Sequence, residues 1–326
     1  MKILHIGDRS GVAFNLAILS KQNGYEVHVV FRPAHDKLEI WKNYQSVAEP
    51  HFERTMKFLF NALIMAKKFD IIHSHIDIII PFLRILYPRK QIICHYHGSD
   101  LRYRTTVRTK FISLFTKKIA ISTPDLLEYV PKSKTTFIPN VINDDFFTDK
   151  LDDREQTIFL PITLRKDKNY MFNLESWKII RDLIPEIKLK IIKIGQDVKE
   201  CQEFLRGDNR VIWLEPLQKN QIIKEMHSCS IVWEQHMLGV FGLTAMEAMA
   251  SGVPVFTYFD DKNNLGGDYN PPVLSVKTPK EQAKLTADLL GNEKLRIEKG
   301  RSCQEWIKQN HSNKRVWSIL RKLYAL

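Results

Sequence analysis

The chain has 326 residues, of which 44% are hydrophobic and 26% charged, and it contains only 13 glycines. This composition excludes a collagen-like, low-complexity or disordered protein, and the length suits two domains of ordinary size better than one. The 49 lysines and arginines outnumber the 37 acidic residues and give a net charge of +12. An excess of positive charge points to an anionic partner, such as nucleic acid, a phosphorylated substrate or an anionic membrane.

The four cysteines form no C-x-x-C pair, so we expect neither a disulfide framework nor a zinc site. The opening residues, MKILHIGDRS, indicate a buried strand and a loop rather than a signal peptide. The apolar stretches are far shorter than the roughly 20 residues that span a bilayer. The sequence therefore predicts a soluble, cytoplasmic protein.

Short apolar runs alternate with amphipathic stretches along the first part of the chain. The apolar run Lys2–Ile6 is followed by the loop Gly7–Gly11 and by a helical pattern from Val12 to Asn23. Further strands are expected at Glu26–Phe31, Asp70–Ser74, Gln91–Tyr96, Lys118–Ile121 and Thr136–Ile138. This alternation predicts a parallel sheet with helices on both faces, which binds its ligands beyond the carboxyl ends of the strands.

A polar, acid-rich segment around Asn143–Gln156 interrupts this alternation and is typical of an interdomain linker. Beyond it we expect strands at Ile158–Pro161, Lys188–Ile194, Val211–Leu214, Ile231–Trp233 and Val255–Thr257, and helices at Tyr170–Leu183, Gln221–His227 and Thr244–Ala250. Two successive α/β units place a cleft between two domains. We expect the first domain at residues 1–145, the linker at 146–156 and the second domain at 157–305.

The segment Val240–Phe256, VFGLTAMEAMASGVPVF, carries the most chemistry. Gly242 lies in a turn before a helix, and the exposed N–H groups of a helix start suit an anion such as a diphosphate. Glu247, further along the helix, can accept both hydroxyls of a ribose. However, Thr244 and Glu247 also match the T-x-x-E capping box, which needs no ligand. Both interpretations remain open at the level of sequence.

The run G-L-x-x-x-E-A-M-A-x-G-x-P-V, from Gly242 to Val255, is similar to the signature of retaining GT-B glycosyltransferases of family 4 (glycosyl transferases group 1). The segments DIIHSH, HGSD and IPN, beginning at Asp70, His97 and Ile138, also resemble the family. The resemblance covers nearly the whole chain. It implies two Rossmann-like domains facing each other across a cleft, an acceptor-binding first domain, and a C-terminal helix at residues 306–326 that packs on it.

The resemblance also implies roles for individual residues. Glu247 would bind the ribose of a nucleotide sugar, and His97 would contact the hydroxyls of the donor sugar. Backbone groups of Phe241, Gly242, Leu243 and Thr244 would hold the sugar and diphosphate, and the loop with Gly7 and Gly11 would face the acceptor. A basic cluster, Arg165, Lys166 and Lys168, would neutralise the diphosphate, although these residues also suit a solvated turn.

One position departs from the family pattern. The family has a second glutamate eight residues before the one that matches Glu247, and this chain has Gly239 there. Glu234 is a candidate for a displaced carboxylate, or it forms only a hydrogen bond at the end of a strand. The departure keeps a second hypothesis open, in which the protein binds a nucleotide or sugar without catalysing transfer. A nucleotide-sugar epimerase is a third hypothesis.

Two further features are histidine pairs and a basic segment. The pairs His73/His75 and His95/His97 each share one face of a strand, but no carboxylate accompanies them at metal spacing, so we expect no metal. The stretch 101–118 contains six basic residues and no acidic one: Arg102, Arg104, Arg108, Lys110, Lys117 and Lys118. It predicts an amphipathic helix that either lies on an anionic membrane or lipid-linked phosphate, or packs on the sheet with a solvated basic face.

The leading hypothesis is a retaining glycosyltransferase that moves a hexose from a nucleotide diphosphate sugar to a hydroxyl of a lipid-linked or cell-surface glycan. It would need no cofactor, would bind no nucleic acid, and would work in the cytoplasm or on the inner face of the cell membrane. The net charge is uneven along the chain: residues 1–150 carry +8, residues 151–300 carry −1, and the last 26 residues carry +5. This distribution fits a first domain that faces an anionic membrane or acceptor.

Overall fold

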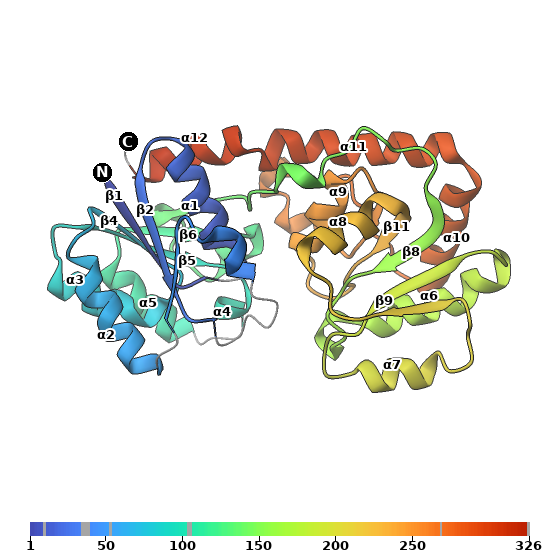
Figure 1. Ribbon diagram of the computed structural model, residues 1–326, viewed down its shortest axis with the longest axis horizontal. Helices are drawn as coiled ribbons and strands as arrows, with labels where there is room; N and C mark the ends of the chain where they lie inside the picture. Colours follow the sequence, from blue (N-terminus) through green and yellow to red (C-terminus); the bar gives the residue numbers. More distant parts are fainter. Residues whose placement is uncertain (9–10, 34–39, 52–53, 103–105, 268, 325–326) are drawn as a thin grey trace. The chain divides into compact units, whose positions relative to one another are not determined.

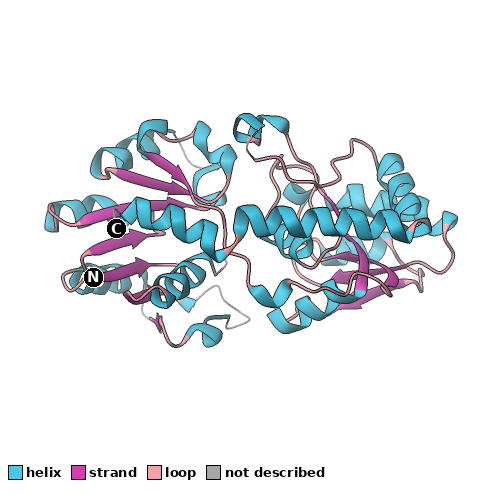
Figure 2. Ribbon diagram, turned by 90° about the horizontal axis from the view of Figure 1, so that it is seen from above, coloured by secondary structure: helices cyan, strands magenta, loops and turns pink. Residues whose placement is uncertain are grey.

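The computed structural model describes residues 1–8, 11–33, 40–51, 54–102, 106–267 and 269–324. The chain forms two compact units. The first comprises Met1–Val141 together with His311–Leu326, and the second comprises Ile142–Asn310. Each unit is a parallel sheet with helices on both faces (Figure 1, Figure 2).

The first unit contains seven parallel strands in the order β3-β2-β1-β4-β5-β6-β7. The strands are β1 (Lys2–Ile6), β2 (Glu26–Phe31), β3 (Ala48–Pro50), β4 (Ile71–Ser74), β5 (Gln91–Tyr96), β6 (Lys118–Ile121) and β7 (Thr135–Phe137). The helices are α1 (Val12–Gln22), α2 (Thr55–Ala66), α3 (Ile80–Leu86), α4 (Ser99–Arg102), α5 (Thr106–Phe115) and α12 (Asn313–Tyr324). The central strands β1, β4, β5 and β6 are largely buried because helices cover both faces of the sheet.

Two apolar clusters lie on the two faces of this sheet. On one face Ile3 and Ile93 pack with residues of α1 and with Leu320 of the C-terminal helix α12. On the other face Ile72 packs with Phe58 of α2 and with further residues of α3 and α5. The last helix of the chain therefore belongs to the core of the first unit, beside α1 (Figure 1).

The second unit contains five parallel strands in the order β10-β9-β8-β11-β12. They are β8 (Glu155–Leu160), β9 (Lys188–Ile192), β10 (Val211–Leu214), β11 (Cys229–Trp233) and β12 (Val255–Phe256). The helices are α6 (Tyr170–Leu183), α7 (Val198–Phe204), α8 (Lys219–Ser228), α9 (Leu243–Ala250), α10 (Pro279–Gly291) and α11 (Glu293–His311). Trp177 of α6 and Trp233 of β11 are fully buried in its core.

The segment 146–156 differs from the sequence prediction, because it is packed into the second unit rather than extended as a linker. Phe146 and Leu151 are buried, and the last two residues of the segment begin β8. The Arg154 guanidinium is buried and donates hydrogen bonds to the backbone carbonyls of Met226, Cys229 and Ser251. The acidic composition of the segment predicted a solvated linker, and it gave no sign that Phe146, Leu151 and Arg154 anchor the segment in the second unit.

The basic stretch 101–118 also differs from the single helix that its pattern predicts. Its first two residues end the short helix α4, a second helix, α5, occupies Thr106–Phe115, and Lys118 already begins strand β6. In the part of the chain that the structure describes, no helix is long and apolar enough to cross a membrane.

Candidate functional site

Each sheet has one point where the order of its strands reverses. In the second unit the chain moves from β8 outward through β9 and β10, and then returns to place β11 and β12 on the other side of β8. In the first unit the same reversal falls between β1 and β4. Parallel sheets bind ligands beyond the carboxyl ends of their strands at such points. The two reversal points are therefore the first places to look for a site.

Glu234 lies at the reversal point of the second unit, directly after β11. Its carboxyl group is buried and accepts a hydrogen bond of 3.0 Å from the Thr257 hydroxyl. Its other oxygen lies close to Gly242, since a Cβ atom at Gly242 would be 3.5 Å from Glu234 Oε1. Burial raises the pKa of Glu234, and the nearby charge of Lys168 opposes this shift. Glu234 therefore points toward the beginning of α9, as a displaced carboxylate would.

The residues after β8 bring positive charge to the same place. The three basic residues lie around a short 3-10 helix, Lys166–Lys168, and Lys168 is the one whose charge reaches Glu234. The backbone N–H of His236 donates to the Lys168 carbonyl at 3.2 Å, which ties this loop to the end of β11. Arg165 is exposed and pairs with Asp167 at 3.0 Å, whereas Lys166 is exposed and lies 3.9 Å from Glu200.

The beginning of α9 completes this arrangement. The helix starts at Leu243 with Gly242 as its N-cap, so Thr244 lies inside the first turn and does not form the capping box with Glu247. Among the residues that the structure describes, no side chain accepts a hydrogen bond from the first N–H groups of α9. Donors of this kind, together with the positive end of a helix dipole, are suited to binding an anion.

Phe241 contributes to the site only through its backbone. Its ring is buried and packs against Phe259, Tyr269 and Trp306. This aromatic anchor fixes the chain immediately before Gly242. Gly242, Leu243 and Thr244 are each partly exposed.

Glu247 lies one turn further along α9 and is half-buried. Burial raises the pKa of its carboxyl group to about 7, and the charge of Lys219 partly offsets this effect. Within the described part of the chain, no hydrogen-bond donor engages this carboxylate. A desolvated carboxylate without a donor costs free energy, which a ligand that supplies hydroxyl donors would recover.

Gly239 occupies the position where the family has its second glutamate. Its φ of +67° is left-handed, a conformation that strains residues with a side chain. Its carbonyl accepts hydrogen bonds from Asn263 Nδ2 at 2.7 Å and from the Asp260 N–H at 3.0 Å. The loop between β11 and α9 is thus built around a glycine here, and Glu234 is the nearest preceding carboxylate in the sequence.

The reversal point of the first unit is different. Gly7 and Gly11 both have a left-handed φ, and Gly7 lies so close to Ile76 that a Cβ atom would be 2.7 Å from that side chain. The Asp8 carboxylate accepts hydrogen bonds from the N–H groups of Gly11 and Ala13, at 2.7 and 2.8 Å. The beginning of α1 is therefore capped by the protein's own carboxylate and offers these N–H groups to no ligand.

His97, at the end of β5, is half-buried, and its backbone N–H donates to the Asp100 carboxylate at 3.0 and 3.1 Å. Its Nδ1 lies 2.8 Å from the Ser122 hydroxyl, and its Nε2 lies 2.7 Å from Nδ1 of His75. Both ring nitrogens of the predicted active-site histidine are therefore held by neighbouring side chains.

These contacts belong to a longer hydrogen-bonded series, which we call the histidine chain. In order, its members are Tyr324, His73, His95, Ser122, His97, His75 and His5. Consecutive polar atoms lie 2.7 to 3.1 Å apart, and the histidines come from the neighbouring strands β1, β4 and β5 or, for His75 and His97, from just beyond them. Burial lowers the pKa of His5 to about 3 and holds the pKa values of His73, His75 and His95 well below the usual range.

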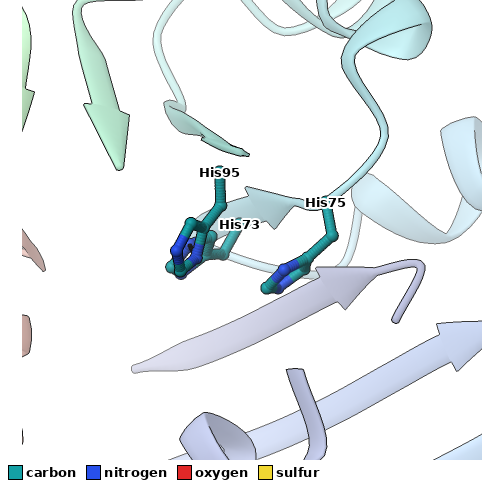
Figure 3. A group of neighbouring side chains, drawn as sticks. All are labelled: His73, His75 and His95. Carbon is teal, nitrogen blue, oxygen red and sulfur yellow. Dashed lines mark hydrogen bonds between the residues drawn. The ribbon is translucent and has the colours of Figure 1, made fainter. Parts of the chain in front are cut away.

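His73, His75 and His95 each offer a ring nitrogen within 4.8 Å of the others, as a metal site would (Figure 3). Their nitrogens, however, are all used by hydrogen bonds of the histidine chain. Two of the three ring pairs also stack, at interplanar angles of 10° and 26°, and the third pair is tilted by 34°. Hydrogen bonding thus accounts for the cluster.

Two arginines of the predicted basic patch form ion pairs within the protein. Arg102 forms a two-pronged ion pair with Asp125, at 2.6 and 3.0 Å, and Arg108 forms another with Asp77, at 3.0 and 2.6 Å. Both guanidinium groups serve to hold helices to neighbouring loops. The local sequence could not show this, since Asp125 lies 23 residues from Arg102 and Asp77 lies 31 residues from Arg108.

Of the remaining members of the patch, Lys118 has a partner within the protein and two lysines are exposed. The Lys118 ammonium donates to the carbonyl of Leu323 in α12 and is half-buried. Lys110 and Lys117 are exposed. Arg104 lies outside the described residues.

Several side chains that organise these sites were not predicted from the sequence. Thr257 holds Glu234, Asp8 caps α1, and Ser122 and Tyr324 complete the histidine chain. Asp8 had a usable signal, because an aspartate shortly before a helical pattern is a common cap. Tyr324 had none, since it is 251 residues from His73.

Known proteins resemble this chain in sequence over one segment. The family model described as Glycosyl transferases group 1 matches residues 141–265, which include Glu234, the loop after β8 and the whole of α9. The match includes Gly242–Val255, the run that carries the resemblance to glycosyl transferases group 1. No curated protein sequence matches the chain.

Solved structures resemble the chain over its whole length. HepE from Anabaena, in complex with UDP and glucose, matches with a TM-score of 0.78 at 14% identity and covers 100% of both chains. A variant of TarM from S. aureus, in complex with fondaparinux, alpha-GlcNAc-glycerol and UDP, matches with a TM-score of 0.76 at 10% identity, also over 100% of both. The N-terminal domain of Candida albicans trehalose-6-phosphate phosphatase matches with a TM-score of 0.72 at 13% identity, covering 99% of this chain and 96% of that one. These likenesses establish the predicted GT-B fold.

Proposed function

We propose that the protein is a retaining glycosyltransferase that moves a hexose from a nucleoside diphosphate sugar to a hydroxyl of a lipid-linked or cell-surface glycan. The observation that carries the proposal is the reversal point of the second unit. The segment matched by the Glycosyl transferases group 1 model contains the beginning of α9, whose first N–H groups have no side-chain cap, and the nearby carboxyl group of Glu234. It also contains Glu247, whose carboxylate accepts no hydrogen bond from a described residue. The complexes of HepE with UDP-glucose and of TarM with UDP support a nucleotide-sugar donor.

The residues divide the work of donor binding. The N–H groups of Gly242, Leu243 and Thr244 would bind the diphosphate, with Lys168 and the exposed Arg165 and Lys166 neutralising its charge. Glu247, in its ionised form, would accept the two hydroxyls of the ribose. Glu234, whose pKa burial raises, would contact the sugar hydroxyls from beside Gly242.

The chemical step needs stabilisation of the departing nucleoside diphosphate. Negative charge grows on the diphosphate as the bond to the sugar breaks, and fixed N–H dipoles with nearby cations lower the free energy of that transition state. In the retaining mechanism that the family resemblance implies, the diphosphate oxygen takes the proton of the incoming hydroxyl on the same face of the sugar. His97 would contact hydroxyls of the donor sugar by exchanging one of its hydrogen bonds to Ser122 or His75. No dedicated protein base, metal or cofactor is assigned.

The experiment is incubation with a panel of nucleotide sugars, with and without a lipid-phosphate acceptor, while release of nucleoside diphosphate and the anomeric configuration of the product are followed. We expect one donor to give acceptor-dependent release with retention. A Glu247→Ala variant should lose this activity, whereas Glu175→Ala, which removes an exposed glutamate of α6, should keep it.

Other outcomes would favour the other hypotheses. Donor binding without turnover across the panel would favour a non-catalytic binding protein, which the left-handed Gly239 at the family's glutamate position supports. Conversion of the nucleotide sugar without release of diphosphate would favour an epimerase. Neither binding nor turnover with any donor would refute the proposal.

A further inference from the structure

The outer face of three neighbouring helices of the first unit is unusually apolar. Ten of the 15 large hydrophobic side chains that are exposed in the described residues lie within Met56–Ile64, Ile78–Leu86 and Val107–Leu114. They are 49% to 77% exposed. These segments belong to α2, to α3 with the turn before it, and to α5, and α3 contacts both other helices (Figure 1). We call this surface the α2–α3–α5 face.

The exposed side chains are not the core-facing sides of these helices. Phe58 of α2, Leu83 of α3 and Ile112 of α5 are buried against the sheet, so each helix already has an apolar side in the core. The exposed residues Phe60 and Phe111 lie on a second apolar side. A helix that is apolar on both sides is expected where both are covered, and contiguous exposed patches of this kind mark interaction surfaces.

The same region accounts for most of the protein's net positive charge. Residues 54–124 contain 13 basic and three acidic residues, a net charge of +10 out of +12 for the whole chain. Six of the 13 basic residues are set aside: five are partly buried, including Arg108 in its ion pair with Asp77, and Arg104 lies outside the described residues. The remaining seven are exposed and form no ion pair within the described part of the chain: Arg54, Lys57, Lys67, Lys68, Arg89, Lys110 and Lys117.

Apolar side chains beside unpaired lysines and arginines fit a lipid surface with negative headgroups. The apolar residues enter the boundary between headgroups and acyl chains, and each basic residue near the surface adds about 1 kcal/mol of attraction. A second copy of this chain fits less well, because it would bring two strongly positive surfaces together. The combination of exposure and charge therefore selects one kind of partner.

We propose that the α2–α3–α5 face docks on an anionic lipid bilayer, with Phe60, Phe82 and Leu114 among the side chains that enter it and Lys67, Lys68, Lys110 and Lys117 among those that contact the headgroups. Its use in reaching a lipid-linked acceptor rests on the proposed function. The docking itself does not, because binding to vesicles requires no turnover.

The test is flotation of the full-length protein with vesicles of phosphatidylcholine alone or mixed with phosphatidylglycerol. We expect binding to the mixed vesicles that is weaker with phosphatidylcholine alone and weaker at high salt, where the headgroup attraction is screened. The triple variant Phe60→Ser, Phe82→Ser, Leu114→Ser should lose at least about tenfold in the vesicle partition coefficient. The quadruple lysine-to-glutamine variant at positions 67, 68, 110 and 117 should lose a similar factor on mixed vesicles only.

Matched controls come from the second unit, where Ile179 and Leu183 are exposed apolar residues and Lys294 and Lys299 are exposed cations. Ile179→Ser with Leu183→Ser, and Lys294→Gln with Lys299→Gln, should leave flotation unchanged. Circular dichroism of each variant separates loss of docking from loss of folding.

No flotation of the wild-type protein, or equal losses in the control variants, would overturn the proposal. A dimer in light scattering that the triple variant abolishes, without flotation, would assign the face to a second copy instead. Nucleotide-sugar turnover by a variant that no longer floats would leave the proposed function intact, so the two proposals fail separately.

Discussion

The two units use the same sheet architecture, but they treat its reversal point in opposite ways. In the first unit Asp8 caps the beginning of α1, and the strand ends are filled by the histidine chain. In the second unit no described side chain caps α9, and the carboxylate of Glu247 has no donor among the described residues. In both units the strand order favours a ligand site at the reversal point. The polar groups beside that point have partners within the protein in the first unit and lack them in the second.

This contrast separates stability from binding. Polar groups that satisfy each other inside the protein stabilise one arrangement and leave little for a ligand. Polar groups held in place without partners cost free energy that a ligand can recover on binding. We therefore expect changes in the histidine chain to act mainly on stability and changes around α9 to act mainly on donor affinity.

The largest expected effect is acid destabilisation of the first unit. His5, His73, His75 and His95 are neutral and buried, with pKa values held below the usual 6.5. Below pH 6.5 the unfolded chain binds protons that the folded unit does not, so stability falls as the pH falls. Each histidine contributes up to about 1.4 kcal/mol per pH unit, and the four together contribute about 5 kcal/mol between pH 7 and pH 5.5. Hydrogen exchange of β1, β4 and β5 at pH 7 and pH 5.5 measures this loss.

The second unit provides the comparison for that measurement. Burial lowers the pKa of His236 there to about 4, and the raised pKa of Glu247 acts in the opposite direction. A group whose folded pKa is about 7 instead of 4.5 favours the folded state at low pH, and that contribution is lost as the pH rises through this range. Equal acceleration of exchange in β8 and β11 would contradict the contrast between the units.

The next effect is on donor affinity. Glu247→Ala should weaken binding of the nucleotide sugar about tenfold to a hundredfold, because hydrogen bonds to a charged group contribute about 1.5–3 kcal/mol. Titration calorimetry with the donor identified in the panel measures this change. Glu247→Gln, which keeps the shape of the side chain without its charge, should fall between the wild-type protein and the alanine variant. Unchanged affinity in Glu247→Ala would refute the ribose assignment.

A smaller effect is expected at the far end of the histidine chain. Each neutral histidine donates one hydrogen bond and accepts one. When the Ser122 hydroxyl likewise accepts from one histidine and donates to the other, all the bonds of the chain run in one direction. If Tyr324 donates to His73, only the Nε2–H of His5 lacks a partner. The opposite direction would also leave the Tyr324 hydroxyl proton without an acceptor among the described residues. Tyr324 is therefore expected to donate, which places the proton of His97 on Nε2.

Tyr324→Phe should lower the free energy of unfolding by about 1–3 kcal/mol, because it leaves the buried Nδ1 of His73 without a donor. It should also remove the preference of His97 for one tautomer, which nitrogen chemical shifts of labelled histidine report. Tyr87→Phe, which removes a tyrosine hydrogen bond to the Leu63 carbonyl elsewhere in the unit, is the matched control for the tautomer. An unchanged His97 tautomer in Tyr324→Phe would contradict the proposed direction of the chain.

The sequence predicted the sheets better than it predicted the polar partners. Strands such as Gln91–Tyr96 and helices such as Tyr170–Leu183 agree with the structure because apolar periodicity is a local property. The sequence left two interpretations of Glu234 open, and the structure gives it both a hydrogen bond from Thr257 at the end of β11 and an oxygen close to Gly242. The ion pair of Arg102 with Asp125 and the bond from His73 to Tyr324 depend on which distant strands and helices become neighbours, and a single sequence does not encode that in any local pattern.

The measurement that tests the central contrast most directly is hydrogen–deuterium exchange of the full-length protein with and without saturating nucleoside diphosphate. A donor site at the second reversal point predicts slower exchange in residues 240–247 and 164–169, with no change in residues 11–16 at the beginning of α1. Protection at the beginning of α1 without protection at the beginning of α9 would place the nucleotide in the first unit and contradict the assignment.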